Sequence, residues 1–317
     1  MKIIAEFGFV TGCYGRDLPM VRATLASIRH YCPEVPICLI VDGDADVGGL
    51  ADQYKLHLLR IAELESERIR GMIQRSTRSK LAAIWEGPFE RFVWMDSDAI
   101  VWGDFTKQVR QDVDFQIFWD RISIDADETV APGWLAHYYF DAERLLSFDP
   151  AFNWRGKAYF CDGVFACRRG SIPVEMWEKV LSWRDSPSNP WPPSFNCMPM
   201  MNYIVHAMAD QGLISTAMTD LQQIPVHHGH EEIEADLVGA GWSFPEKIAR
   251  PRTLHFCGRK PYTFSRDVYT KPFTIARLEH YRTLKSAPGA WATVAREDAR
   301  VAAEKARKRI QRQLRKP

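Results

Sequence analysis

Apolar segments alternate with helical segments along the first hundred residues. The short apolar runs that favour buried strands are 7–12, 37–41, 55–61 and 91–95. The segment 17–31 has a helical pattern with apolar residues on one face, and Pro33 ends it. Repeats of strand, helix and strand at this spacing predict right-handed crossovers and a mainly parallel sheet covered by helices on both faces. The fold class is therefore α/β.

Charge divides the chain into a body and a tail. From Arg296 to Pro317 there are nine basic and three acidic residues, although the net charge of the whole chain is only +1. We expect one domain over 1–287 and a basic helical tail over 288–317. Apolar residues one turn apart give that tail a narrow stripe. The stripe fits contact with an anionic membrane, packing in an oligomer or a solvated helix, and the sequence leaves these alternatives open.

Composition excludes several classes of protein. The chain has 317 residues, of which 46% are hydrophobic and 26% charged, as in an ordinary globular protein. The sequence contains no uncharged apolar run long enough to predict a membrane span, and the start "MKIIAEFGFVTG" does not resemble a cleaved signal. Seven scattered cysteines without a C-x-x-C pair argue against a disulfide framework and a zinc ribbon. We expect a cytoplasmic protein, with peripheral contact at the inner membrane face as an option, and no nucleic-acid partner.

The first candidate for chemistry is the pair Asp96 and Asp98, which follows a predicted buried strand. In extended chain these side chains point the same way and Ser97 points the other way. Two carboxylates at the carboxyl end of a strand can hold a divalent cation together with phosphate groups. The alternative is a structural role, such as capping the next turn. The pattern D-x-D alone is weak evidence because it occurs five times in this chain.

Three stretches together resemble one enzyme family over about residues 7–285. They are "RSKLAAIWEGPFERFVWMDSDAIVWGD", "YFCDGVFACRRG" and "LHFCGRKPY", which begin at positions 78, 159 and 254. Their order and motifs resemble the retaining glycosyltransferases of family eight, which include glycogenin and the bacterial lipooligosaccharide galactosyltransferases. The last stretch is similar to the family signature H-F-x-G-x-x-K-P-W, one residue shorter. The resemblance implies a single Rossmann-like domain of the GT-A type.

The resemblance also implies a metal site and a donor. Asp96, Asp98 and His255 would be the ligands of a Mn²⁺ or Mg²⁺ ion that holds the diphosphate of a UDP-sugar. Two carboxylates and an imidazole suit such an ion, which neutralises charge on the departing nucleoside diphosphate. For His255 alone, the alternative is a buried core histidine.

Further residues would contact the donor by the same resemblance. Lys80 would reach it from its helix, and its alternative role is that of an exposed helix lysine. Gly258 would allow close backbone approach to the phosphates, and Lys260 would add a positive charge. The other expected donor contacts are Thr11, Gly12 and Ser97.

The sequence departs from the family around the sugar. Cys161 replaces the family's Asn, and Cys197 and Met198 replace an Asp-Gln pair that precedes Asn202. Asp162 could compensate by binding sugar hydroxyls or the acceptor, so it joins Lys80 as a catalytic candidate. No nucleophile is assigned, because the residues do not distinguish a covalent route from a same-face displacement.

The acceptor would be a glycan, a lipid-linked molecule or a protein. Aromatic residues in loop-like regions could contact it or could belong to the core: Trp134, His137, Tyr138, Tyr139, Trp154 and Trp191. The leading hypothesis is a metal-dependent hexosyltransferase that works with retention. The alternatives are a catalytically silent relative that binds nucleotide sugar and a partner protein, and a nucleotidyltransferase, which usually has a more basic glycine-rich loop than "VTGCYGR".

Overall fold

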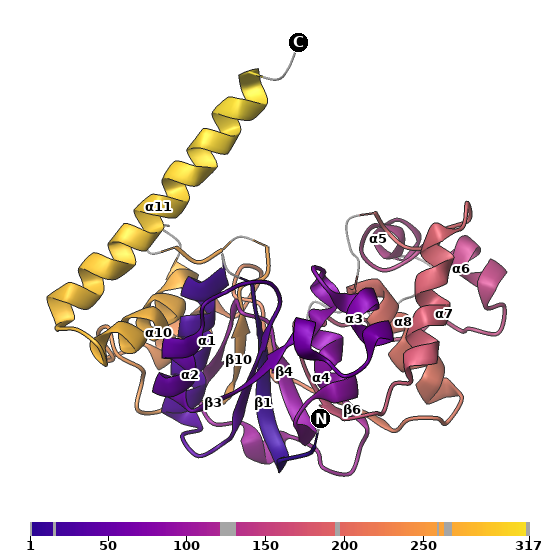
Figure 1. The fold of residues 1–317 in the computed structure, drawn as a ribbon, viewed down its shortest axis with the longest axis horizontal. Coiled ribbons are helices and arrows are strands. Elements are labelled where there is room, and N and C mark those ends of the chain that lie inside the picture. The colour runs from indigo at the N-terminus through magenta and orange to yellow at the C-terminus, as the bar shows by residue number, and fades with distance from the viewer. Residues whose placement is uncertain are drawn as a thin grey trace.

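The computed structural model describes residues 2–14, 17–120, 131–193, 197–258, 260–262 and 268–314. Strands alternate with helices from β1 to β4, and the later elements follow in a less regular order (Figure 1). The strands are β1 (Ala5–Cys13), β2 (Ile37–Val41), β3 (Leu56–Arg60), β4 (Phe89–Met95), β5 (Ala99–Trp102), β6 (Phe115–Phe118), β7 (Val164–Arg168), β8 (Thr216–Thr219), β9 (Gln222–Gln223) and β10 (Arg252–His255). The helices are α1 (Leu18–Tyr31), α2 (Gly48–Tyr54), α3 (Glu67–Ile73), α4 (Leu81–Glu86), α5 (Ala131–Tyr138), α6 (Ala142–Phe148), α7 (Val174–Ser182), α8 (Met198–Asp210), α9 (His230–Asp236), α10 (Lys271–Arg282) and α11 (Ala287–Leu314).

The central sheet has seven strands in the order β3-β2-β1-β4-β7-β6-β8. Its strands are parallel except for β7, which runs antiparallel to both of its neighbours, β4 and β6. The predicted α/β class with a mainly parallel sheet is therefore confirmed, and the predicted strands and first helix lie where the apolar pattern placed them. The reversal of β7 was not predicted, because apolar periodicity carries no information on strand direction.

The inner strands of this sheet are buried on both faces, which explains why they are mostly apolar, whereas the edge strands β3 and β8 have exposed residues. Neighbouring residues of β4 enter different cores: Trp94 packs in the core under α4, α7 and α8, whereas Val93 packs in the core under α1 and α2. Alternation of this kind follows from the two-residue repeat of a strand. The result is a rigid platform whose strand ends are fixed in position.

A second sheet of three strands, in the order β5-β10-β9, lies beside the first. The chain passes from one sheet to the other at residues 96–98, between the end of β4 and the start of β5. These residues form a turn, in which the amide of Ala99 donates to the carbonyl of Asp96 at 2.9 Å. The expectation of extended chain at Asp96 and Asp98 was therefore wrong, because the change of sheet requires the chain to bend there.

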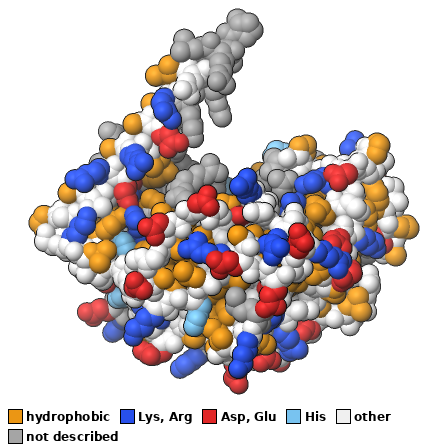
Figure 2. Space-filling model, in the orientation of Figure 1, with side chains coloured by type: hydrophobic (Ala, Val, Ile, Leu, Met, Phe, Trp, Pro, Cys, Tyr) orange, Lys and Arg blue, Asp and Glu red, His pale blue; other side chains and the backbone are white. Residues whose placement is uncertain are grey.

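The last helix, α11, packs on α10 near its start and then projects beyond the body (Figures 1 and 2). Ala290 and Val294 are buried against Leu278 and Tyr281 of α10. The helix predicted for the tail is therefore present. Further along it, Ile310 is 56% exposed, so this part of the helix faces solvent. None of the helices in the described part of the chain is long and apolar enough to span a bilayer.

Candidate functional site

The ends of three strands meet at the turn between the two sheets. His255 is the last residue of β10 and pairs with Ala99 of β5, next to Asp98. On the other side, Met95 pairs with Val164 of β7, and the amide of Asp96 donates to the carbonyl of Gly163 at 2.7 Å. Register alone therefore brings residues from positions 96, 163 and 255 to one place.

Asp96, Asp98 and His255 converge as the family resemblance implied. Each offers one ligand atom, and these three atoms all lie within 4.8 Å of one another. His255 Nε2 is 3.5 Å from Asp98 Oδ1 and 4.0 Å from Asp96 Oδ2. Two hard carboxylate oxygens and one imidazole nitrogen form a donor set that suits Mn²⁺ or Mg²⁺.

Gln222 fixes the orientation of the His255 ring. Its amide nitrogen donates to the carbonyls of Phe118 and Cys161 at 3.1 and 3.2 Å, which leaves its oxygen facing His255. His255 Nδ1 therefore donates to Gln222 Oε1 at 2.8 Å, and Nε2 points toward the carboxylates. A second hydrogen bond of this kind is what orients metal-binding histidines. Gln222 was missed in the sequence, where β9 is too short to have a period.

Lys80 lies between the carboxylates at the last residue of a short helical turn, η3 (Thr77–Lys80). Its ammonium is 3.1 Å from Asp162 Oδ2 and 3.4 Å from Asp96 Oδ1, and it donates to the carbonyl of Asp162 at 2.9 Å. Lys80 is only 4% exposed, so its predicted alternative as a surface lysine does not hold. Trp94 completes this side by donating from its indole nitrogen to Asp96 Oδ1 at 2.8 Å.

Lys260 approaches from the opposite side and pairs with Asp98 Oδ2. Its side chain is 34% exposed, in contrast to the 8% of Asp98, so it can move away from this carboxylate. Gly258, two residues earlier, has φ +79° with open space where a Cβ would lie. That left-handed conformation favours glycine and lets the chain turn between His255 and Lys260.

The charges of the site are balanced among its own residues. Three carboxylates face the two ammoniums and the imidazole. Burial raises the pKa of Asp96 against the opposing charges of Lys80 and His255. Burial would also raise the pKa of Asp98, but His255 and Lys260 hold it well below its usual range.

The pKa values of the two basic residues Lys80 and His255 are raised by the neighbouring acidic groups. Burial would lower the pKa of Lys80, yet the carboxylates of Asp162 and Asp96 raise it well above its ordinary value. Burial likewise opposes protonation of His255, but its contacts with Cys161 and Asp98 raise its pKa well above the usual value. A bound divalent cation would take over the role of the imidazole proton.

A cavity of about 260 Å³ opens beside these charges. Gly12, Lys80 and Ser97, which the sequence analysis names as expected donor contacts, line it together with Asp96, Asp98 and Lys260. Thr11 does not line this cavity: its side chain is fully buried in β1. Residues that the sequence reasoning missed are Tyr14, whose hydroxyl lies 3.3 Å from Ser79 Oγ, and Trp94.

One residue that departs from the resembled motif, Cys197, and one that keeps it, Asn202, lie close to the segment of Asp162. Cys197, at the start of α8, is buried, and burial and the Asp162 carboxylate raise its pKa well above the usual value. Asn202 makes three hydrogen bonds to backbone, with its oxygen on the amide of Phe160 at 2.8 Å. Asn202 therefore positions the segment before Asp162, and its polar groups are already used.

The six aromatic residues considered for the acceptor differ in burial, and one of them, His137 on α5, is exposed. Tyr139, Trp154 and Trp191 are buried in the core under α7 and α8, where packing is their role. Trp134 and Tyr138 on α5 are only partly buried and pack on the edge of that core.

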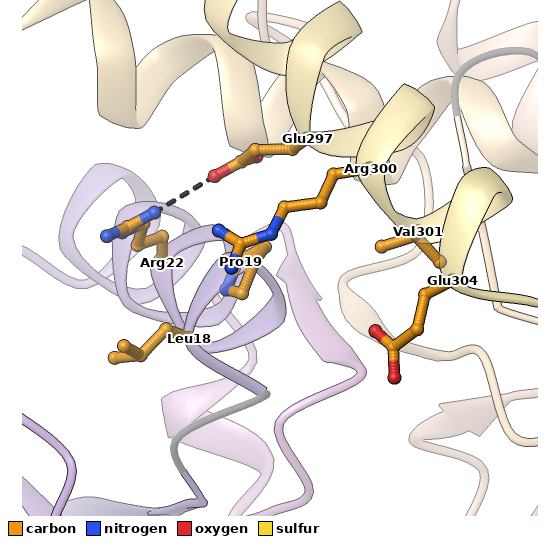
Figure 3. Close-up of a pocket in the computed structure, with 7 residues that line it drawn as sticks. All are labelled: Leu18, Pro19, Arg22, Glu297, Arg300, Val301 and Glu304. Carbon is orange, nitrogen blue, oxygen red and sulfur yellow. Dashed lines mark hydrogen bonds and ion pairs between the residues drawn. The ribbon is translucent and has the colours of Figure 1, made fainter. Parts of the chain in front are cut away.

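A second cavity, of about 290 Å³, lies between α1 and α11 (Figure 3). Arg22 and Glu297 form an ion pair of 2.9 Å across it, and Arg300 and Glu304 face it from α11. The first turn of α1 separates the two cavities, since Asp17 and Met20 line the first and Leu18 and Pro19 the second.

No family model and no curated protein matches the sequence. Solved structures do match the fold. The galactosyltransferase LgtC, in complex with donor and acceptor sugar analogues, aligns with a TM-score of 0.53 and 12% identity over 93% of this chain and 100% of that chain. The bifunctional glycosyltransferase WbbM aligns with a TM-score of 0.51 and 14% identity, and the alignment covers 88% of this chain and 52% of the WbbM chain. The glycosyltransferase GlyE of Streptococcus pneumoniae TIGR4 aligns with a TM-score of 0.50 and 12% identity, and the alignment covers 90% of this chain and 63% of the GlyE chain. The chain therefore has the GT-A fold of these glycosyltransferases.

Proposed function

We propose that this protein is a glycosyltransferase that moves a hexose from a nucleotide sugar, a UDP-sugar, to a glycan, lipid-linked or protein acceptor. Transfer proceeds with retention and needs Mn²⁺ or Mg²⁺. One observation carries the proposal: Asp96, Asp98 and His255 present their ligand atoms to one point at the strand ends, within 4.8 Å of one another. The likeness to glycosyltransferases of known structure supports it.

The donor set of the site fits the ion. A buried carboxylate, Asp98, next to the half-buried Asp96 would be unfavourable without compensating charge, and here two lysines and an imidazole supply it. When bound, the divalent ion would neutralise the negative charge that builds on the leaving nucleoside diphosphate. Asp96, Asp98 and Nε2 of His255 would hold it, and Gln222 would keep Nε2 facing it.

The remaining residues would bind and orient the donor. Lys260 would exchange its contact with Asp98 for an oxygen of the diphosphate, because its side chain is partly exposed. Lys80 is held by Asp162 and Asp96 and would keep the Asp162 carboxylate in place. Asp162 would then accept hydrogen bonds from sugar hydroxyls, since its environment excludes most water.

The basic part of α11 would make peripheral contact with an anionic membrane surface at the cytoplasmic side. It carries basic residues over its projecting half, and each one near such a surface adds roughly 1 kcal/mol. Binding of the protein to vesicles with anionic lipid, compared with neutral vesicles, tests this. Equal binding to both kinds of vesicle, or no binding, would contradict it.

The metal and nucleotide are tested by thermal unfolding. Mn²⁺ with UDP should raise the melting temperature, and Asp98→Ala should abolish the increase because a ligand and the partner of Lys260 are lost. The matched control is Asp112→Ala, which changes an exposed aspartate of another D-x-D pair. Absence of a shift with any nucleotide would count against the function.

Hydrolysis of the donor, screened over UDP- and GDP-sugars with Mn²⁺, identifies the sugar. The same screen addresses a second candidate function, a catalytically silent protein that binds nucleotide sugar and acts through a partner protein. Cys197 favours that candidate, because a thiol lies beside Asp162 where the family has a carboxylate. Binding without turnover of any donor would support it, and turnover would exclude it.

A further inference from the structure

A group of soft ligand atoms lies on the far side of the His255 ring. Cys161 Sγ is 3.6 Å from His255 Nδ1, whereas the carboxylates face Nε2. Cys257, two residues after His255, completes the group, and the three ligand atoms all lie within 4.8 Å of one another. Both cysteines are free thiols and are only partly buried, so an ion can reach them.

We propose that Cys161, His255 and Cys257 form a second metal site, which binds a thiophilic divalent cation such as Zn²⁺. The donor set decides the class of ion: two thiolates and one imidazole suit Zn²⁺ and Cd²⁺, while Mn²⁺ and Mg²⁺ prefer the carboxylate side. The site is therefore chemically distinct from the one proposed for the donor, although both use the same ring. It does not depend on the proposed transferase function.

The spacing fits tetrahedral coordination. Bonds of about 2.3 Å to sulfur and about 2.0 Å to nitrogen, at a tetrahedral angle, separate the two ligand atoms by roughly 3.5 Å. The distance of 3.6 Å between Cys161 Sγ and His255 Nδ1 matches this value. Gln222 Oε1 is only 2.8 Å from Nδ1, closer than the roughly 3.3 Å between a nitrogen and an oxygen ligand of one tetrahedral ion, so a solvent molecule would take the fourth position.

The protons can be accounted for. Binding displaces one proton from each thiol and the proton of Nδ1, and all three leave to solvent while the cation takes their places. Nε2 keeps its proton, which faces Asp98 Oδ1 at 3.5 Å. The ring thus has an acceptor for its remaining proton in either mode: Gln222 when Nε2 binds a metal, and Asp98 when Nδ1 does.

The experiment is a titration of the reduced full chain with Cd²⁺, followed by the ultraviolet charge-transfer absorption of cadmium–thiolate bonds. One equivalent should bind with this absorption. Cys161→Ser and Cys257→Ser should each raise the dissociation constant by at least about 10-fold, since loss of a direct ligand exceeds the effect of losing an outer partner. Cys32→Ser is the matched control. This buried thiol follows the last residue of α1 and contacts Asp104, away from Cys161, His255 and Cys257.

Two further readouts keep the result interpretable. Thermal unfolding of each variant without metal shows whether it is folded, and Cys257→Ser tests the site if Cys161→Ser does not fold. Asp96→Asn should leave Cd²⁺ binding within about 2-fold, because this carboxylate is 4.0 Å from Nε2 and does not hold its proton, while it removes the stabilisation by Mn²⁺ and UDP, so failure of one site is distinct from failure of the other. Absence of the absorption, or absorption unchanged in both cysteine variants, would overturn the proposal.

Discussion

Replacement of Gly163 by alanine should displace the imidazole of His255. A Cβ at this position would lie 2.1 Å from Cε1 of the ring and 2.7 Å from each of its nitrogens. Gly163 does not have a left-handed φ, so the backbone itself tolerates alanine and the conflict is with the ring alone. The ring cannot simply rotate away, because Gln222 holds Nδ1 and Asp98 faces Nε2.

The magnitude follows from the contact. An overlap of more than 1 Å with a buried, hydrogen-bonded ring belongs to the overpacking class, which costs about 1–3 kcal/mol of unfolding free energy. A second cost is the affinity for Mn²⁺, because a ligand moved by about 1 Å no longer meets the geometry that the ion requires. We expect a loss of affinity of at least about 10-fold.

The assay is denaturant unfolding, with Mn²⁺ affinity measured by the signal of the free ion in electron paramagnetic resonance. Gly71→Ala is the matched control: Gly71 lies in α3 with open space around it, so alanine should stabilise the helix by roughly 0.5–1 kcal/mol. In a His255→Ala background the ring is absent, and Gly163→Ala should then cost less than about 0.5 kcal/mol. The difference is a coupling energy between the two positions.

Two results would refute this reasoning. The first is a Gly163→Ala protein with the stability and Mn²⁺ affinity of the parent, which would mean that His255 is not packed against residue 163. The second is an equal cost of Gly163→Ala with and without the His255 ring, which would place the cause in the backbone.

Three other predictions follow from buried polar contacts. Asp298→Ala should lower the unfolding free energy by about 1–3 kcal/mol, because Arg277 loses its fully buried partner at 2.6 Å and keeps only the ion pair with Glu297 at 2.8 Å; no measurable change in urea unfolding would contradict this. Burial lowers the pKa of His280 to about 3, so the folded state holds it neutral, and stability should fall by about 1.4 kcal/mol for each pH unit below about 6.5. A His280→Gln variant should show a shallower pH dependence of its melting temperature, and an unchanged slope would exclude His280 as the cause. Gln222→Leu leaves Nδ1 of His255 without its acceptor and should weaken Mn²⁺ binding about 10- to 100-fold by calorimetry, whereas unaltered affinity would deny Gln222 a positioning role.

The sequence predicts the local features of this fold well. β1, α1, β2 and β4 lie where apolar periodicity indicated, because burial of one or two faces determines that periodicity directly. The convergence of Asp96, Asp98 and His255 was expected from the family motifs, and the register of β10 on β5 explains it. The identity of these three residues is thus available from the sequence.

Their surroundings are not. Gln222 lies in a two-residue strand and contacts a ring 33 positions later, so no local pattern indicates it. The burial of Lys80 depends on Asp162, 82 positions away, and the contact of Cys161 with His255 spans 94 positions. Such pairs are set by which strands are neighbours, and the antiparallel insertion of β7 that brings Asp162 and Gly163 to the site has no signature in periodicity.

The passage of the chain from β4 to β5 has a consequence for how the molecule holds together. Asp96 follows the carboxyl end of β4, a central strand of the large sheet, and His255 ends β10 of the small sheet, so an ion bound by both residues would link the two sheets. Part of the free energy of binding this ion would then stabilise the contact of the small sheet with the large one. A change that weakens the affinity for the ion would therefore also make local separation of the two sheets easier.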